Sequence, residues 1–458
     1  MVRSVTGDAE GMCRMSSGLG RRDLLGWGLA GAGVLGAMSL AGCGSGGSGG
    51  GSSGSGGSAA LRFMFWGSGD RVERFQGAID LFHERHPDIR VSPEYADIDA
   101  IKTKLSVAMS GGDLPDVFWV HGDLFAPMVA EGKLMELGPL FGDGIDASGF
   151  TDSTLAAGGQ VDGAQWAISH GLQSVGVFAD LTVLEPLGIV PPSYPEAWTW
   201  DEYEEISLQV HDALGPDFWG TDEPTYAGAG NYFRAWARQR GEQLWTDDGD
   251  IGFTEATFRE WAEYWTRMRD AGAAVPVALA LEQNPFFEGA PMIRGMAAFH
   301  MRNSNQMAEL STLTDHELTL MPSPGNGGEG NRYIGLDPNT MAISADTRNP
   351  EAAILFTDFM LNDPERAEII GTTIGAPPTS AIREHIKPTI SEPEAIFLDY
   401  IEFEATAELD PVPATPTTGA AFGSGMTRTM EELAYGQLTV DDATARVFGE
   451  LRDALGAG

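Results

Sequence analysis

The sequence predicts an α/β fold, and three observations support this prediction. Between residues 61 and 120, short apolar runs alternate with amphipathic helical patterns, which is the order expected of a parallel sheet covered by helices. The chain has 458 residues, enough for two or three domains with sizeable cores. Hydrophobic residues make up 42% of the chain, so it is not disordered throughout.

The first α/β units can be placed along the sequence. A strand is expected at residues 61–66, followed by a helix with Asp70 as its N-cap and Glu73 as the capping-box partner. This helix ends near His86, before a proline. A second strand (89–95), a second helix (98–110) and a third strand (116–120) follow. Because ligands bind beyond the carboxyl ends of such strands, residues 66–71 and 119–123 are expected to face a ligand.

The first 58 residues are expected to export and anchor the protein. Arg21 and Arg22 precede an uncharged, mostly apolar run at 24–40, and the segment Leu-Ala-Gly-Cys ends at Cys43. This layout is typical of a secretory signal and resembles a twin-arginine signal of lipoprotein type, which implies removal of residues 1–42 and lipidation of Cys43. Residues 44–58 are nine Gly and six Ser, so 43–58 is expected to be a flexible tether spanning roughly 20 Å. An ordinary membrane helix is the alternative.

The composition excludes several classes of function. With 66 acidic and 28 basic residues the formal net charge is −38, which argues against nucleic acid or an anionic lipid surface as a partner. Two cysteines are too few for a disulfide scaffold, an iron–sulfur cluster or a four-cysteine zinc site. Metalloprotease, phosphate-loop and calcium-loop motifs are missing, and the nucleophile-elbow pattern does not occur outside the Gly/Ser segment. We therefore expect no catalytic residues, no cofactor and no metal.

A series of motifs resembles one family. The segments are SGGDLPDVFWV (110–120), VDGAQWAISHGLQSVGVFAD (161–180), AWTWDEYEEI (197–206), FFEGAPMIRGMAAF (286–299), RYIGLDPNTMAIS (332–344) and IGAPPTS (374–380). In this order, after a lipoprotein-type signal, they resemble the extracellular solute-binding proteins that supply sugars to ABC importers. The resemblance spans nearly all of residues 60–455, although no single segment is diagnostic.

The resemblance implies a two-lobed fold of the periplasmic-binding-protein type II. Its discontinuous α/β lobes are joined by a hinge and close on a ligand between them. Lobe 1 is expected at 59–167 and 336–372, and lobe 2 at 168–335 and 373–458. The protein would act as a monomer on the outer face of the membrane, held by its lipid anchor, and would deliver a sugar to the importer's permease subunits without catalysis.

Candidate ligand contacts in lobe 1 follow from the chemistry of sugars, whose ring faces stack on aromatic rings and whose hydroxyls bind polar groups. Trp66 and Trp119 end predicted strands, and the resemblance implies that Trp119 stacks on the ligand. The other candidates are Asp70, Arg71, His121 and Asp123. Each has a structural alternative, since tryptophans also fill cores, Asp70 also caps a helix, and His121 and Asp123 are also compatible with solvated loop residues.

Candidates in lobe 2 and at the crossings between lobes are less specific. Tyr232 matches a sugar-contacting tyrosine of the family, and Trp236 lies four residues on, on the same helical face. A buried aromatic stripe is the alternative for both. Further candidates are His170 at the first crossing, Arg302 and Asn303 after a strand, and Asp337 and Asn339 at the second crossing. The sequence lacks the family's usual tryptophan near residue 303 and has Phe178-Ala179 where Tyr-Asn is common, which argues against a long maltodextrin-like ligand.

Two other functions remain open from the sequence. A binder of a polyamine or another cationic solute would also use aromatic side chains and carboxylates. A secreted, lipid-anchored carbohydrate-active enzyme would need two carboxylates held about 5–9 Å apart across a bound sugar. Arg71 beside Asp70 favours a neutral sugar or polyol over a cation.

Overall fold

The computed structural model describes residues 58–456, except 68, 193, 195, 197, 227–228, 247, 283–286, 328–334, 407–415 and 417–421. The expected signal, Cys43 and nearly all of the expected tether therefore lie outside the described residues. The fold is α/β, as the sequence predicts, and is built on two main sheets. Among the described residues, no helix has the length and apolar character needed to cross a membrane.

The first sheet has five strands in the order β2-β1-β3-β11-β6. Its parallel part is the one that the sequence predicts, because β1 pairs in parallel with β2 and β3. Strands β11 and β6 extend the sheet in antiparallel fashion and come from later in the chain. The strands are β1 (Ala59–Trp66), β2 (Ile89–Ala96), β3 (Val117–Val120), β6 (Ile168–Gln173) and β11 (Asp337–Ile343).

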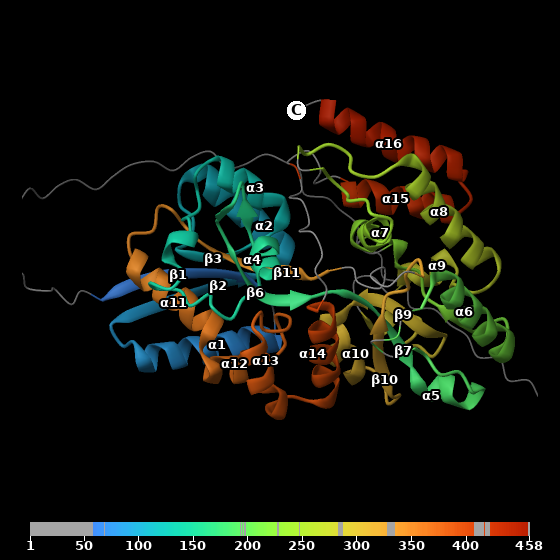
Figure 1. The fold of residues 1–458 in the computed structure, drawn as a ribbon, viewed down its shortest axis with the longest axis horizontal. Coiled ribbons are helices and arrows are strands. Elements are labelled where there is room, and N and C mark those ends of the chain that lie inside the picture. Colours follow the sequence, from blue (N-terminus) through green and yellow to red (C-terminus); the bar gives the residue numbers. More distant parts are fainter. Residues whose placement is uncertain are drawn as a thin grey trace, which may run out of the picture. The chain divides into compact units, whose positions relative to one another are not determined.

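Helices cover both faces of this sheet because alternate residues of its buried strands point to opposite sides. Phe63 and Trp119 pack against the core under α1 and α11, whereas Met64 and Phe118 pack against the core under α2 and α3. Figure 1 shows α1 and α12 below the sheet and α2 and α3 above it. The helices are α1 (Gly69–Arg85), α2 (Ile98–Gly111), α3 (Gly122–Ala130), α4 (Asp152–Ala157), α11 (Pro350–Asn362) and α12 (Pro364–Ile370). The next helix, α13 (Ser380–Ile386), packs its Ile382 and Ile386 in the core that contains Phe178.

The second sheet has four strands in the order β10-β7-β9-β8. Its strands are β7 (Val175–Asp180), β8 (Trp219–Thr221), β9 (Ala297–Asn303) and β10 (Leu318–Pro322). A separate two-stranded sheet pairs β4 (Gln160–Val161) with β5 (Ala164–Gln165).

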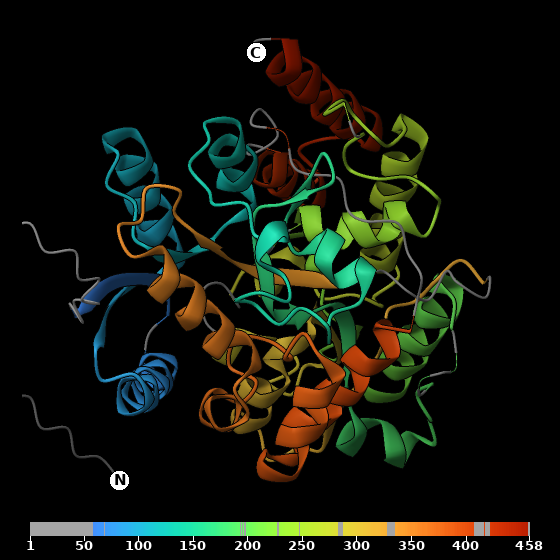
Figure 2. The same ribbon diagram turned by 60° about the vertical axis from the view of Figure 1, so that its left-hand side comes forward.

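Nine helices of the described chain accompany the second sheet. Val177 and Ala179 face an aromatic-rich core shared with α6, α7, α8, α15 and α16, and Phe178 faces a second core with α10 and α14. Figure 1 and Figure 2 both show the red helices α15 and α16 beside α8. The helices are α5 (Leu181–Leu184), α6 (Trp200–Leu214), α7 (Ala229–Arg238), α8 (Glu255–Asp270), α9 (Val277–Glu282), α10 (Met307–Thr312), α14 (Glu392–Glu404), α15 (Phe422–Ala434) and α16 (Val440–Gly456).

Two local expectations need correction. The expected lobe boundary at residue 168 puts β6 in the second lobe, whereas β6 pairs with β11 in the first sheet, so the chain leaves that sheet only after Gln173. Helix α1 begins at Gly69, so Asp70 lies inside its first turn and is not the N-cap. The capping box expected at Thr199 and Glu202 is confirmed at the start of α6.

Candidate ligand-binding site

A cavity of about 570 Å³ lies between elements of both main sheets, and we call it the cleft cavity. From the first sheet and its helices it is lined by Trp66, Arg71, Ile98, Trp119, Val120, His121, Gly122 and Phe125, and by Ala156, Ala157, Gly159 and Gln160. Helix α7 and the turn after β9 contribute Arg234 and Asn305. The segments that cross between the sheets contribute Gln173, Leu336, Asp337, Pro338, Asn339, Thr340 and Ile374.

Two tryptophans form an aromatic wall of the cleft cavity, but only one of them is partly open. Trp119 is 1% exposed because Phe65, Phe75 and Trp66 surround it and His170 stacks on it, with ring centroids 4.5 Å apart. Trp66 meets Trp119 at an interplanar angle of 80° and is only partly buried. Trp119 therefore reaches the cavity with little of its ring, and Trp66 has the larger open aromatic surface.

His170 lies behind this wall as a neutral support. Its side chain is 2% exposed, and burial lowers the pKa of its imidazole well below the usual range, with further lowering by Arg366 and Arg71. His170 does not line the cleft cavity. The structure therefore places it behind the tryptophan wall and outside the cavity lining, although the sequence predicts a ligand contact.

Arg71 and Asn339 bind a crossing segment as well as lining the cavity. The Arg71 Nη2 donates to the Thr373 carbonyl at 2.6 Å, and the Asn339 Nδ2 donates to the Ile374 carbonyl at 2.9 Å. Burial lowers the pKa of Arg71, an effect that Glu309 opposes. These two predicted contacts thus fix the position of Ile374 at the cavity surface.

Arg234 and Asp337 form a polar pair across the cleft cavity. Their Nη2 and Oδ1 atoms are 3.4 Å apart, and the Gln173 Nε2 donates to the Asp337 Oδ2 at 3.3 Å. Arg234 lies on α7, whereas Asp337 begins β11, so the pair joins the second-sheet region to the first sheet. Arg71, Arg234 and Asp337 are the charged side chains among the described residues that line the cavity.

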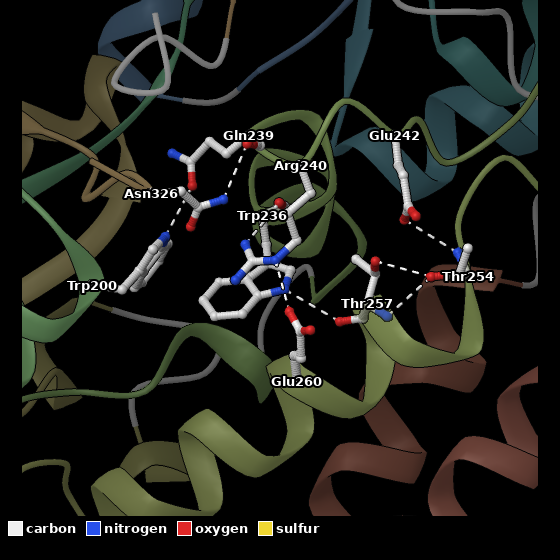
Figure 3. Close-up of polar contacts among 9 residues, drawn as sticks. All are labelled: Trp200, Trp236, Gln239, Arg240, Glu242, Thr254, Thr257, Glu260 and Asn326. Atoms are coloured by element: carbon white, nitrogen blue, oxygen red, sulfur yellow. Dashed lines mark hydrogen bonds and ion pairs between the residues drawn. The ribbon is translucent and has the colours of Figure 1, made fainter. Parts of the chain in front are cut away.

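Trp236, a predicted contact, lies on the other side of α7 from Arg234. Residues two positions apart in an α-helix are separated by roughly 200° around its axis, so the side chains of Arg234 and Trp236 point in opposite directions. Trp236 is 3% exposed, the Arg240 guanidinium lies 3.4 Å from the centre of its ring, and Glu260 pairs with Arg240 at 3.0 Å (Figure 3). Trp236 is therefore part of the aromatic-rich core beside the second sheet and lines a separate hollow of about 360 Å³.

The remaining predicted residues do not line the cavity as expected. Tyr232 and Arg302 are 5% and 4% exposed and contact each other, and Asn303 ends β9 without lining the cavity. The Asp70 carboxylate accepts from the Arg74 Nε at 2.6 Å and also does not line it. The side chain of Asp123 lies outside the described residues.

The structure thus brings six of the thirteen predicted residues together at one cavity: Trp66, Arg71, Trp119, His121, Asp337 and Asn339. Sequence reasoning missed Arg234, Asn305, Gln160 and Gln173. Arg234 had a usable signal, because it lies opposite Tyr232 and Trp236 on a helix whose other face is aromatic. The three amides, Asn305, Gln160 and Gln173, had no such signal, since isolated amide side chains occur throughout the chain. No group of three or more described His, Cys, Asp or Glu side chains lies close enough to hold a metal ion.

Residues 66–367 match the family model for bacterial extracellular solute-binding proteins. The chain belongs to this family. Its members bind solutes and are not enzymes, and they work with ABC transporters. A protein named as an uncharacterized lipoprotein in the oleD 5' region of Streptomyces antibioticus is 24% identical over 312 residues, which are 64% of each chain, so the alignment spans less than two thirds of that relative.

Solved structures of solute-binding proteins show the same two-lobed fold. A family 1 extracellular solute-binding protein from Alicyclobacillus acidocaldarius has a TM-score of 0.72 and 24% identity, covering 87% of this chain and 99% of the other. A periplasmic oligogalacturonide-binding protein from Yersinia enterocolitica, in complex with saturated digalacturonic acid, has a TM-score of 0.70 and 20% identity, covering 86% and 99%. Because these identities are below 25%, the similarity to the solved structures establishes only the fold.

Proposed function

We propose that this solute-binding protein captures a sugar or short oligosaccharide in the cleft cavity and delivers it to the permease of an ABC importer. The observation that carries the proposal is the composition of the cavity wall. It combines the partly open ring of Trp66 with amides and guanidinium groups, including Gln160, Gln173, Asn305 and Arg234. Aromatic faces and planar polar groups match the two surfaces of a sugar. A cavity of about 570 Å³ lies within the range for small-molecule sites.

The charge around the cleft cavity supports a neutral sugar over a polyamine. A polycation needs carboxylates that are free to pair with it, but the Asp337 carboxylate is already bound by Arg234 and Gln173. Arg71 also lines the cavity, and the pKa of nearby Glu309 is raised by burial and by Glu288. The described cavity lining is thus not acidic, although the whole chain is.

The cavity also supports binding over hydrolysis. Hydrolysis of a glycosidic bond uses two carboxyl groups on either side of the scissile bond. Asp337 is the single carboxylate among the described residues that line the cavity, and it is engaged by Arg234. We therefore propose that the ligand leaves the cavity unchanged.

The attachment to the membrane is part of the same proposal. Export by the twin-arginine route, cleavage before Cys43 and lipidation of that cysteine would hold a monomer at the outer face of the membrane. The relative named as a lipoprotein supports the anchor, and the Gly/Ser segment gives it a tether of roughly 20 Å. Mass spectrometry of the membrane fraction tests this part, because Cys43→Ser should remove the lipid mass and release the protein.

A thermal-shift screen tests the ligand class. Maltotriose, acarbose, digalacturonate and spermidine would be added to residues 59–458, and a sugar is expected to raise the melting temperature. Trp66→Ala should then weaken binding of that sugar at least about tenfold, which corresponds to about 1.4 kcal/mol. Tyr435→Ala is the control, because Tyr435 is a 48% exposed aromatic residue that does not line the cavity. Stabilisation by spermidine alone would refute the sugar proposal.

A further inference from the structure

A buried charged network lies under the second-lobe wall of the cleft cavity. Asp222, next to the end of β8, is 0% exposed, and its Oδ2 lies 2.5 Å from the Nδ1 of His300, which is also 0% exposed. The Met301 amide donates to the Asp222 Oδ1 at 3.3 Å. The Arg302 Nη2 lies 3.9 Å from the same carboxylate. Three consecutive residues of β9 therefore hold one carboxylate.

The protonation states within this network follow from its neighbours. Burial alone would raise the pKa of Asp222, but His300, Arg302 and the Met301 amide together lower it. Burial lowers the pKa of His300, with Asp222 opposing the effect. The network therefore contains an ionised carboxylate, a neutral imidazole and a charged guanidinium at neutral pH.

Arg302 connects this network to α7. Its guanidinium lies 5.9 Å from the centre of the Tyr232 ring, and the two side chains also form a hydrogen bond. Tyr232 is 5% exposed and faces the core on the first half of α7. Arg234 lies two residues further on, roughly 200° around the helix, and faces the cleft cavity.

We propose that Arg302 is a positioning residue for ligand binding, which acts through Tyr232 to hold α7 so that Arg234 faces Asp337. The Asp222 carboxylate in turn holds Arg302 against Tyr232. The buried Arg302 guanidinium contacts the Asp222 carboxylate and the Tyr232 ring, so it has little freedom to move. Its fixed position therefore restricts Tyr232 and, through Tyr232, the orientation of α7. Tyr232 and Arg302, which the sequence analysis predicts as ligand contacts, thus act from behind the residues that line the cavity. This inference rests on the proposed function.

The test separates local positioning from a general loss of stability. Arg302→Met removes the charge and the contact with Tyr232, whereas Arg302→Lys keeps a cation at the same place. Asp180→Asn is the matched control, because Asp180 is a 1% exposed carboxylate of the same sheet that pairs with His316 and lies on β7, away from the Arg302–Tyr232 contact. Hydrogen exchange of the peptide covering α7 is measured for each variant, together with the melting temperature.

The expected result is specific to α7. Arg302→Met should speed amide exchange in residues 229–238 at least about tenfold, and Arg302→Lys should recover most of the protection. Asp180→Asn should lower the melting temperature and leave exchange in α7 within about twofold. Equal exchange in α7 for Arg302→Met and Asp180→Asn at matched loss of melting temperature would overturn the inference.

Ligand titration provides the functional readout. The sugar among maltotriose, acarbose and digalacturonate that stabilises the unmodified protein is titrated calorimetrically. Arg302→Met is expected to raise its Kd about tenfold, with Arg302→Lys and Asp180→Asn within about threefold of the unmodified protein. An unchanged Kd for Arg302→Met would overturn the positioning role. If none of the three sugars binds, the proposed function fails, whereas the exchange experiment still decides whether Arg302 holds α7.

Discussion

Replacing Arg366 by methionine is expected to stabilise the protein, although it removes a charged side chain from a helix. Arg366 lies on α12 and is 2% exposed. Its Nε and Nη2 atoms have no hydrogen-bond partner within the described part of the chain. Burial lowers the pKa of its guanidinium to about 10, an effect that Asp363 only partly opposes.

The size of the effect follows from this pKa. A guanidinium pKa lowered to about 10 means that the folded protein binds this proton less tightly than the unfolded chain by roughly 3 kcal/mol. Methionine fills much of the same volume without a charge, and replacing poorly compensated buried charges by apolar residues is often stabilising. Part of the gain is lost to imperfect packing, so we expect about 1–3 kcal/mol. For about 400 residues this corresponds to a rise in Tm of roughly 1–4 °C.

Calorimetric melting of paired variants tests this reasoning. Arg383 on α13 is the control, because it is also buried, at 5% exposure, but its donors are satisfied. Its Nε donates to Glu402 at 2.6 Å and its Nη1 to the Pro377 carbonyl at 2.8 Å. Arg383→Met should therefore cost about 1–3 kcal/mol. If Arg366→Met destabilised the protein as much as Arg383→Met, Arg366 would have favourable partners and the reasoning would be refuted.

Two further predictions concern strand β6. Burial lowers the folded-state pKa of His170 below its unfolded value, so the stability it contributes is present above about pH 6.5 and is lost as the pH falls. Between pH 7.5 and 5.5 the loss is at most about 1.4 kcal/mol. Calorimetry of His170→Gln should show a correspondingly flatter pH profile, and an unchanged profile would mean that His170 is charged in the fold. A Cβ on Gly171 would lie 2.1 Å from the Ile374 carbonyl oxygen, so Gly171→Ala should cost about 2–4 kcal/mol, whereas Gly449→Ala in α16, with no atom within 4 Å, should be neutral or stabilising by up to about 1 kcal/mol. Equal melting temperatures for the two variants would contradict this packing.

The parallel part of the first sheet was predictable because its signals are local. The strands at 61–66 and 89–95 and the helix at 98–110 are found within two residues of their expected bounds. Their apolar periodicity and the turn glycines lie within short windows, so no distant contact was needed to identify them. Strand β6 was assigned to the wrong lobe because its partner β11 is more than 160 residues away, and antiparallel pairing at that distance leaves no local pattern.

The cleft cavity was only partly predictable, for a related reason. Trp66, Trp119 and His121 lie at or just after the ends of strands that could be located, so the rule for parallel sheets placed them at the cavity. Whether a tryptophan turns its face or its edge to the ligand depends on His170 and Phe75, which come from other elements. The pair of Arg234 and Asp337 requires the relative placement of two sheets, which no single segment encodes.

Calorimetric titration of the anchor-free chain, residues 59–458, with sugars tests the central claim most directly. A sugar is expected to bind with one site per chain, with a Kd that Trp66→Ala raises at least about tenfold and Tyr435→Ala leaves unchanged. Binding of spermidine without binding of any sugar, or a sugar affinity that is insensitive to Trp66→Ala, would contradict the account.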